Sequence, residues 1–311
     1  MGYVILLLAA SLAGQAKVEN VKPGDLDAAR RLMQNGRYAE AEEAFEAATV
    51  AAAKQPGALS PEIERALVLG KAESQSAQGE LDKAVKTLEA LAAKAPKSPE
   101  AAARLAEIAF TRGDWETADS WVAKALAVAP DDLSARWTAV RLLDSRGRLD
   151  DAVAACKWFV DYYNTHNDAL AKDADGLILI GQAAERYYRA SARGEDLSDA
   201  LNDVINEIYE GAYKADSNCW KAPWLEGRLF LSGYNERAAS KELARAQQIN
   251  PLSPEVLVTL GQADLQGYRL AAGRSKAERA LAVNPRYGPA HVLLADLNIS
   301  DERFADAKAA A

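Results

Sequence analysis

Residues that build catalytic and metal sites are scarce in this sequence. Its 311 residues include only two histidines and two cysteines. His166 and His291 have no His or Cys partner at metal-ligand spacing, so a local zinc site is excluded. The sequence also contains no HExxH run, no Gly-rich phosphate loop and no GxSxG elbow. We therefore predict no catalysis in this chain, no metal and no small-molecule cofactor.

Proline, aromatic residues and blocks of one charge are scarce as well. With 11 Pro and 7% aromatic residues, and without long apolar–polar alternation, the Ala-rich chain is predicted to be helical throughout. The 45 acidic and 37 basic residues give a net charge of -8 and are spread along the chain. No basic run interleaved with aromatic residues is present, which argues against a nucleic-acid partner.

A single apolar run, from Tyr3 to Ala13, lies near the start of the chain. It has the length of a signal-peptide core, is too short to span a bilayer as a helix, and is followed by the small residues Gly14 and Ala16. We predict a signal peptide over residues 1–16, a linker over residues 17–24, and an exported protein. No Lys or Arg precedes the run, so the alternative is a buried or amphipathic first helix in a cytoplasmic protein.

The feature that organises the chain is a marker that recurs every 34 residues. The pattern Gly-x-(Trp/Leu)-x-x-Ala begins at Gly79, Gly113 and Gly147. The best copy, GDWETADSWVAKALAVAP, starts at Gly113, and the chain resembles the tetratricopeptide family in this period and pattern. The resemblance implies an all-α, right-handed α-solenoid of about eight helix-turn-helix repeats, irregular around the fifth.

The repeat pattern predicts the organisation of the chain. Repeats 1–4 cover residues 25–164, an irregular long helical hairpin covers 165–219, and repeats 6–8 cover 220–311, the last one incomplete. The overlong first repeat predicts a break at Gln55-Pro56-Gly57, and residues 165–176 read as a polar loop whose Asp173 or Asp175 caps the next helix. Since no polar terminal cap follows the eighth repeat, we expect the protein to continue beyond Ala311.

The two cysteines form no framework from which a pairing follows. In the repeat register Cys156 falls on a core position of the second helix of its repeat, and Cys219 lies near a repeat boundary. We predict that both are unpaired, and a disulfide stays an alternative if the chain is exported.

A tetratricopeptide array implies a concave groove that binds a peptide or a partner protein, lined by positions 2, 5, 9, 12 and 13 of each first helix. Trp137 with Arg141, and Trp224 with Arg228, place an Arg one turn beyond a Trp, which suits ring packing with a carboxylate contact. The alternative is that the tryptophans pack between repeats and the arginines pair with neighbouring acids. The predicted groove residues are Glu107, Phe110, Trp137, Arg141, Gln182, Glu185, Trp224 and Arg228.

A narrower resemblance covers residues 156–285, through strings such as WFVDYYNTHNDALAKDADG and SNCWKAPWLEGRLFLSGYNERAASKELARAQQINP. These look like the central part of exported bacterial proteins in which a repeat array precedes a peptidase MA-like metallohydrolase domain. That family carries its HExxH helix after the repeats, and this chain lacks it. The chain also departs from chaperone-binding repeats, because Glu73, Glu107 and Arg141 stand where their carboxylate clamp needs Asn and Lys.

Three functions remain open at this stage. The first is a protein-interaction scaffold that binds a peptide, a partner protein or the chain's own missing C-terminal domain in the groove. The second is the non-catalytic N-terminal portion of an exported zinc metallopeptidase. The third is a structural component of an envelope assembly.

Overall fold

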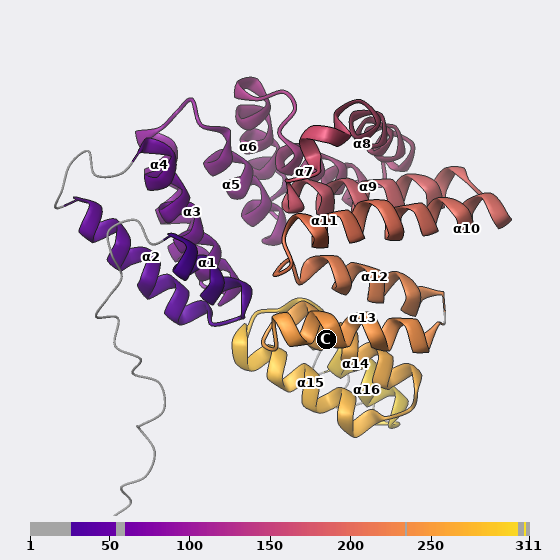
Figure 1. Ribbon diagram of the computed structural model, residues 1–311. Helices are drawn as coiled ribbons and strands as arrows, with labels where there is room; N and C mark the ends of the chain where they lie inside the picture. The colour runs from indigo at the N-terminus through magenta and orange to yellow at the C-terminus, as the bar shows by residue number, and fades with distance from the viewer. Residues whose placement is uncertain (1–25, 54–59, 234, 304–307, 309–311) are drawn as a thin grey trace, which may run out of the picture.

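A computed structural model describes residues 26–53, 60–233, 235–303 and 308, and all regular structure in them is helical. The helices are connected as consecutive antiparallel hairpins (Figure 1). They are α1 (Leu26–Gln34), α2 (Tyr38–Ala53), α3 (Pro61–Ala77), α4 (Leu81–Lys94), α5 (Pro99–Thr111), α6 (Trp115–Val128), α7 (Leu133–Ser145), α8 (Leu149–Leu170), α9 (Ala174–Ser191), α10 (Gly194–Asp203), η1 (Val204–Tyr209), α11 (Glu210–Ala215), α12 (Lys221–Ser232), α13 (Glu236–Ile249), α14 (Pro254–Gln266), α15 (Leu270–Val283) and α16 (Gly288–Ser300). The prediction of an all-α repeat solenoid is confirmed.

The turns inside the hairpins, apart from that between α9 and α10, share one backbone hydrogen-bond pattern. In the third repeat the amide of Asp114 donates to the carbonyl of Ala109 at 3.0 Å, five residues back, and Gly113 between them has a φ of 76°. This is the Schellman ending of a helix, in which a left-handed residue lets the chain reverse while satisfying a terminal carbonyl. The seventh repeat makes the same bond from Arg269 to Asp264 at 2.7 Å.

Small residues allow the two helices of a repeat to approach closely. In α5 nearly every residue of the packed face is a buried Ala, and α6 contributes Ala118 and Ala125, both fully buried. Larger side chains such as Leu105 and Val122 fill the space that remains. Because each apolar face is covered by the neighbouring hairpin, the core runs along the array as a series of clusters.

The prediction of a polar loop over residues 165–176 is wrong. Helix α8 continues to Leu170, and His166, with φ -130° and ψ 15°, interrupts its geometry without ending it. Residues 164–169 are all exposed, whereas Leu170 is buried against the core, so one apolar contact anchors the end of an otherwise exposed helical segment. The expected cap is present, because the Asp173 carboxylate accepts from the amide of Gly176 at 2.9 Å.

The fifth unit departs from the other hairpins in its second half. Helix α10 begins at Gly194 and then passes into the π-helix η1 before α11. The ring of Tyr209 in η1 is fully buried and occupies the space beside Gly181 of α9, where a methyl group would overlap it. The wider π turn thereby places a large aromatic side chain opposite a residue without one.

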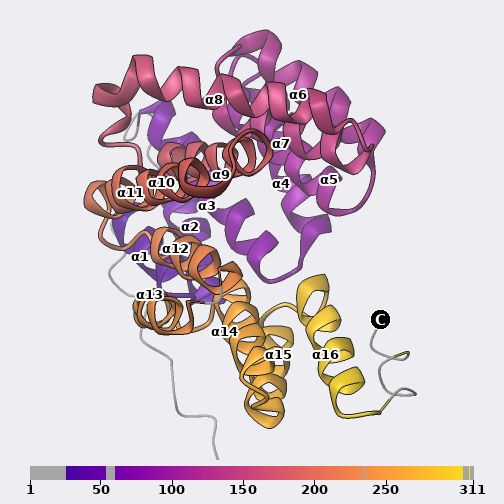
Figure 2. The ribbon, with the colours of Figure 1, turned by 90° about the vertical axis from the view of Figure 1, so that its right-hand side faces the viewer.

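The array curls until its beginning meets its later repeats. Figure 1 and Figure 2 both show α1 and α2, in indigo, near α13. A hydrogen bond of 3.0 Å between Asn250 and the Tyr38 hydroxyl joins the two parts. The first helices of successive repeats, α3, α5, α7, α9, α12 and α14, therefore surround a common interior.

Several predicted features lie outside the described residues. These are the signal peptide over residues 1–16, the linker over 17–24, the break at Gln55-Pro56-Gly57 and most of the second helix of the eighth repeat. Within the described residues, no helix combines the length and the apolar character that crossing a membrane requires. Cys156 and Cys219 are both buried and both free.

Candidate concave binding face

The first part of the predicted groove is a contact between α5 and α7. The Arg141 guanidinium of α7 lies over the Phe110 ring of α5, 4.1 Å from its centroid. Its Nη1 is 3.9 Å from a carboxylate oxygen of Glu107. Ring, acid and arginine thus form one cluster, which we call the Arg141 cluster. The spacing of three residues between Glu107 and Phe110 brings both to the side of α5 that faces α7.

A matching cluster joins α9 and α12. Arg228 donates to Glu185 at 3.3 Å, and its guanidinium carbon is 5.5 Å from the centroid of the Trp224 ring. The Trp224 indole N–H donates to the Thr259 hydroxyl of α14 at 2.8 Å. Arg189 also binds Glu185, at 3.0 Å. We call Glu185, Trp224 and Arg228 the Arg228 cluster, in which a third helix fixes the tryptophan.

The remaining two predicted residues take other roles. Trp137 meets the buried Phe159 edge to face, with ring centroids 6.3 Å apart, and packs against the large core around α8 and α9. Gln182 donates to the carbonyl of Ile178 in its own helix, at 3.4 Å. Trp137 therefore packs between helices, and both arginines pair with acids while their side chains stay partly exposed.

The structure adds four charged residues that the prediction omitted from the site. Arg104 of α5 donates to Glu107 at 3.1 Å, and Lys221 of α12 lies 3.6 Å from Asp175 of α9. Glu73 of α3 raises the pKa of Arg104 more than any other group does, and it raises that of Lys221 as well. Asp175 and Lys221 stand at position 2 of their repeats, a groove position, so the register alone contained the signal.

Charged side chains on different helices shift one another's pKa values across this interior. Burial alone would raise the pKa of Glu107, but Arg104 and Arg141 lower it. Lys221 lowers the pKa of Asp175, although the Asp175 side chain keeps 76% of its surface exposed. Charged side chains of both signs on several first helices therefore act on one another across the interior that these helices surround, and we call this interior the lumen.

Both predicted arginines retain capacity for a ligand. A guanidinium has five N–H donors, and the carboxylate contacts described above use only part of them on Arg141 and Arg228. Their side chains keep 30% and 41% of their surface exposed, respectively. An incoming carboxylate can share each arginine with the acid already present, or displace that acid.

The described residues form no cluster of side chains that could hold a metal ion. No three His, Cys, Asp or Glu side chains come together among these residues as ligands would. His166 stacks on Tyr162 with ring centroids 4.1 Å apart, and its Nδ1 lies 3.0 Å from the carbonyl of the same residue. His291 has its Nε2 3.1 Å from the carbonyl of Pro285, so each histidine contacts the backbone of its own neighbourhood.

Comparison with known proteins identifies the repeat. A family model described as tetratricopeptide repeat matches residues 32–108 and 75–135. Among solved structures, a thermophilic TPR protein of Thermus thermophilus is 18% identical with a TM-score of 0.50, over 68% of this chain and 100% of that one. A search of curated proteins finds no match.

Two further structures extend the similarity of fold along the chain. A chain of the APC/C hetero-tetramer Cut9-Hcn1 has a TM-score of 0.59 at 13% identity, over 92% of this chain and 52% of that one. A monomeric mutant of IFIT1 with Gppp-AAAA has a TM-score of 0.53 at 12% identity, over 95% and 74%. Together with the 34-residue period and the hairpin geometry, these matches show a tetratricopeptide-type helical repeat fold, and the family model identifies the tetratricopeptide repeat itself over residues 32–135.

Proposed function

We propose that this protein is a binding scaffold that holds a peptide segment of a partner protein along its concave face. Tetratricopeptide arrays are in general scaffolds for protein interaction and typically carry no catalysis of their own. The observation that carries the proposal is the pair of arginine clusters, because each presents a partly exposed guanidinium beside an aromatic ring. Such a pair suits a segment with acidic residues at two points.

The charges of the interior favour a peptide over a nucleic acid. Four acids, Glu73, Glu107, Asp175 and Glu185, alternate with the four cations Arg104, Arg141, Lys221 and Arg228. A nucleic-acid site needs an excess of cations that neutralise phosphates, whereas a peptide offers both signs of charge and backbone groups. We extend this proposal to an exported protein, on the basis of the apolar run near the start of the sequence.

The proposal is tested on an array of random peptides that differ in the number of acidic residues. The double variant Arg141→Glu/Arg228→Glu is compared with Arg148→Glu/Lys157→Glu, which changes net charge equally but lies on the turn before α8 and on its exposed side. Peptides selected by the native protein should bind the first variant at least about tenfold more weakly, roughly 1.4 kcal/mol, and the second almost unchanged. Equal affinity for both variants would contradict the groove assignment.

A further inference from the structure

The first repeat contacts the sixth through buried polar groups. The Asn250 side chain, at the end of α13, is fully buried and donates to the Tyr38 hydroxyl of α2 at 3.0 Å. Beside it, the Gln34 amide of α1 donates to the carboxylate of Asp216 at 2.7 Å. Burial is the main cause that raises the pKa of Tyr38, so its hydroxyl stays protonated and accepts from Asn250.

The turn inside the first repeat packs against a loop of the sixth repeat, and the turn inside the second repeat packs in the same way against a loop of the seventh. A methyl group on Gly36, in the α1–α2 turn, would overlap the Asn250 side-chain oxygen and come within 2.9 Å of the Leu252 Cβ. A methyl group on Gly79, in the α3–α4 turn, would overlap the Asn284 side-chain oxygen in the same way. Asn250 and Asn284 occupy the same position in successive repeats. We call these two turn-to-loop contacts the closing contact.

The other two glycine turns show that this contact is specific. Gly36, Gly79, Gly113 and Gly147 have nearly equal φ values of 77°, 77°, 76° and 70°. A methyl group on Gly113 or Gly147 would meet no atom within 4 Å. All four turns need glycine for their left-handed backbone, but only the first two also need it to seat another part of the chain.

The closing contact completes the ring of first helices around the lumen. It joins the first repeat to the sixth through Tyr38 and Asn250, and the second to the seventh through the Gly79 turn and Asn284. In agreement with this placement, Glu73 of α3 raises the pKa of Lys221 of α12 across the interior. The two ends of the ring therefore meet at the closing contact.

We infer that the first two repeats are a movable wall of the binding site, and that opening of the closing contact controls entry of a partner segment into the lumen. The inference rests on the proposed function of the concave face. Its physical basis is the small size of the contact, which consists of two turns seated on two loops, one hydrogen bond to Tyr38 and one between Gln34 and Asp216. A contact of this size can open while the hairpins on either side stay folded.

The contact is tested by cross-linking without a ligand. Gln34→Cys/Asp216→Cys is treated with a short bis-maleimide, in an otherwise native chain whose Cys156 and Cys219 are buried. In the background Gly36→Ala/Gly79→Ala, cross-linking should be about tenfold slower or more, because the methyl groups keep the contact open. In the background Gly113→Ala/Gly147→Ala, which imposes the same backbone strain, the rate should equal that of the parent. Equal slowing in both backgrounds would overturn the inference.

A milder variant covers the case in which Gly36→Ala/Gly79→Ala does not fold, as judged by its helical circular dichroism. Tyr38→Phe removes only the hydroxyl that accepts from Asn250 and leaves a buried amide donor without its acceptor. It should slow cross-linking about threefold, in proportion to the smaller loss of contact. An unchanged rate in this variant would contradict the role of the contact.

Entry into the lumen is measured separately with Glu73→Cys. In the native background a maleimide on a large polyethylene glycol should label this residue about tenfold more slowly than a small maleimide does, and Gly36→Ala/Gly79→Ala should remove the difference. Equal labelling by both reagents in the native background would show that the lumen is open, and the inference would fail. Neither assay uses a peptide, so failure here and failure of the proposed function are distinguishable.

Discussion

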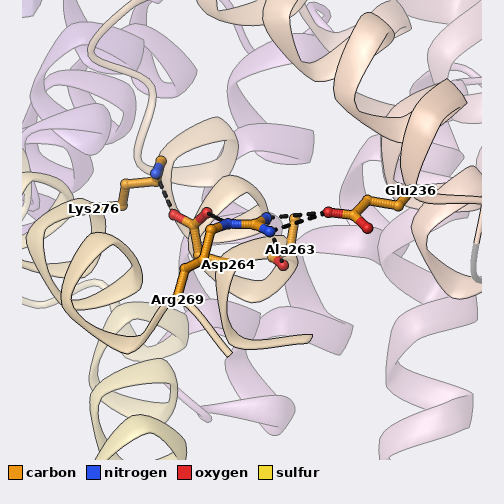
Figure 3. Close-up of polar contacts among 5 residues, drawn as sticks. All are labelled: Glu236, Ala263, Asp264, Arg269 and Lys276. Atoms are coloured by element: carbon orange, nitrogen blue, oxygen red, sulfur yellow. Dashed lines mark hydrogen bonds and ion pairs between the residues drawn. The ribbon is translucent and has the colours of Figure 1, made fainter. Parts of the chain in front are cut away.

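Two buried carboxylates in successive repeats are accommodated in opposite ways. Asp264 of α14 has its side chain only 11% exposed, and it binds both the Arg269 guanidinium, at 2.9 Å, and the Lys276 ammonium (Figure 3). Glu226 of α12 is 4% exposed and leaves one carboxylate oxygen without a partner. The first acid is neutralised by cations, whereas the second is neutralised by its own proton.

The surroundings of Glu226 explain the difference. Burial, and after it the neighbouring acids Glu242 and Glu210, raise its pKa to about 8. Arg245 and Lys241 act in the opposite direction, but Arg245 already binds Glu210 and Glu242, and Lys241 binds Glu242. The comparison teaches that a buried acid in this array is stabilising only where the adjacent turn and helix supply its cations.

Removing the charge of Asp264 should have the largest effect. Asp264→Asn leaves Arg269 and Lys276 without their shared carboxylate at a mostly buried position, so the protein should lose about 2 to 3 kcal/mol of its free energy of unfolding. Urea denaturation at neutral pH measures the change. A loss below about 0.5 kcal/mol would show that the network in Figure 3 is held mainly by water-exposed pairing.

Glu226→Gln should have the opposite sign and depend on pH. In the unfolded chain a glutamate titrates near 4.5, and in the folded protein Glu226 titrates near 8. Between these values the folded state holds a proton that the unfolded state has released, so native stability falls as pH rises through this window and levels off above it. The variant lacks this slope and should be more stable than the native protein by about 2 kcal/mol near pH 6, a difference that grows until about pH 8.

The measurement is urea denaturation of both proteins at a series of pH values on either side of the window. The two stabilities should converge below pH 4.5, where Glu226 is protonated in both states. If the difference between the proteins stays constant with pH, Glu226 is ionised in the folded state and the contrast with Asp264 disappears.

The smallest effect is expected at the outer end of the same network. Glu236 binds Arg269 at 3.2 Å, but its side chain is 61% exposed and that of Arg269 is 48% exposed. Glu236→Gln should therefore change the free energy of unfolding by no more than about 0.5 kcal/mol. A loss as large as that of Asp264→Asn would mean that the network acts as one unit rather than as a buried core with an exposed extension.

Most of the fold could be predicted because the turns of the first four repeats each carry a glycine at the same position. Gly113 marks its turn, whereas the left-handed position of the seventh repeat is held by Tyr268, with a φ of 57°. That turn lacks the glycine signal. Only Pro251 and Pro285, which are 34 residues apart, show the repeat period in this part of the sequence. The end of α8 was missed because its polar residues resemble a loop, and only packing of Leu170 reveals the helix.

The site was less predictable than the fold. The register identified Arg141, Arg228, Glu107 and Glu185 as groove residues, but it did not specify which acid would bind which arginine. The contact between Tyr38 and Asn250 joins residues that are 212 positions apart, so it depends on the curvature accumulated over five repeats. Curvature is a sum of small rotations at each interface, and no local pattern in the sequence specifies it.

Hydrogen exchange of the native protein with and without a peptide selected on the array tests the central claim most directly. If the concave face binds the segment, added peptide should slow amide exchange in the first helices α5, α7, α9 and α12 and leave the outer helices α6 and α13 unchanged. Slowed exchange confined to α6 and α13, or no change in α7 and α12, would contradict the claim.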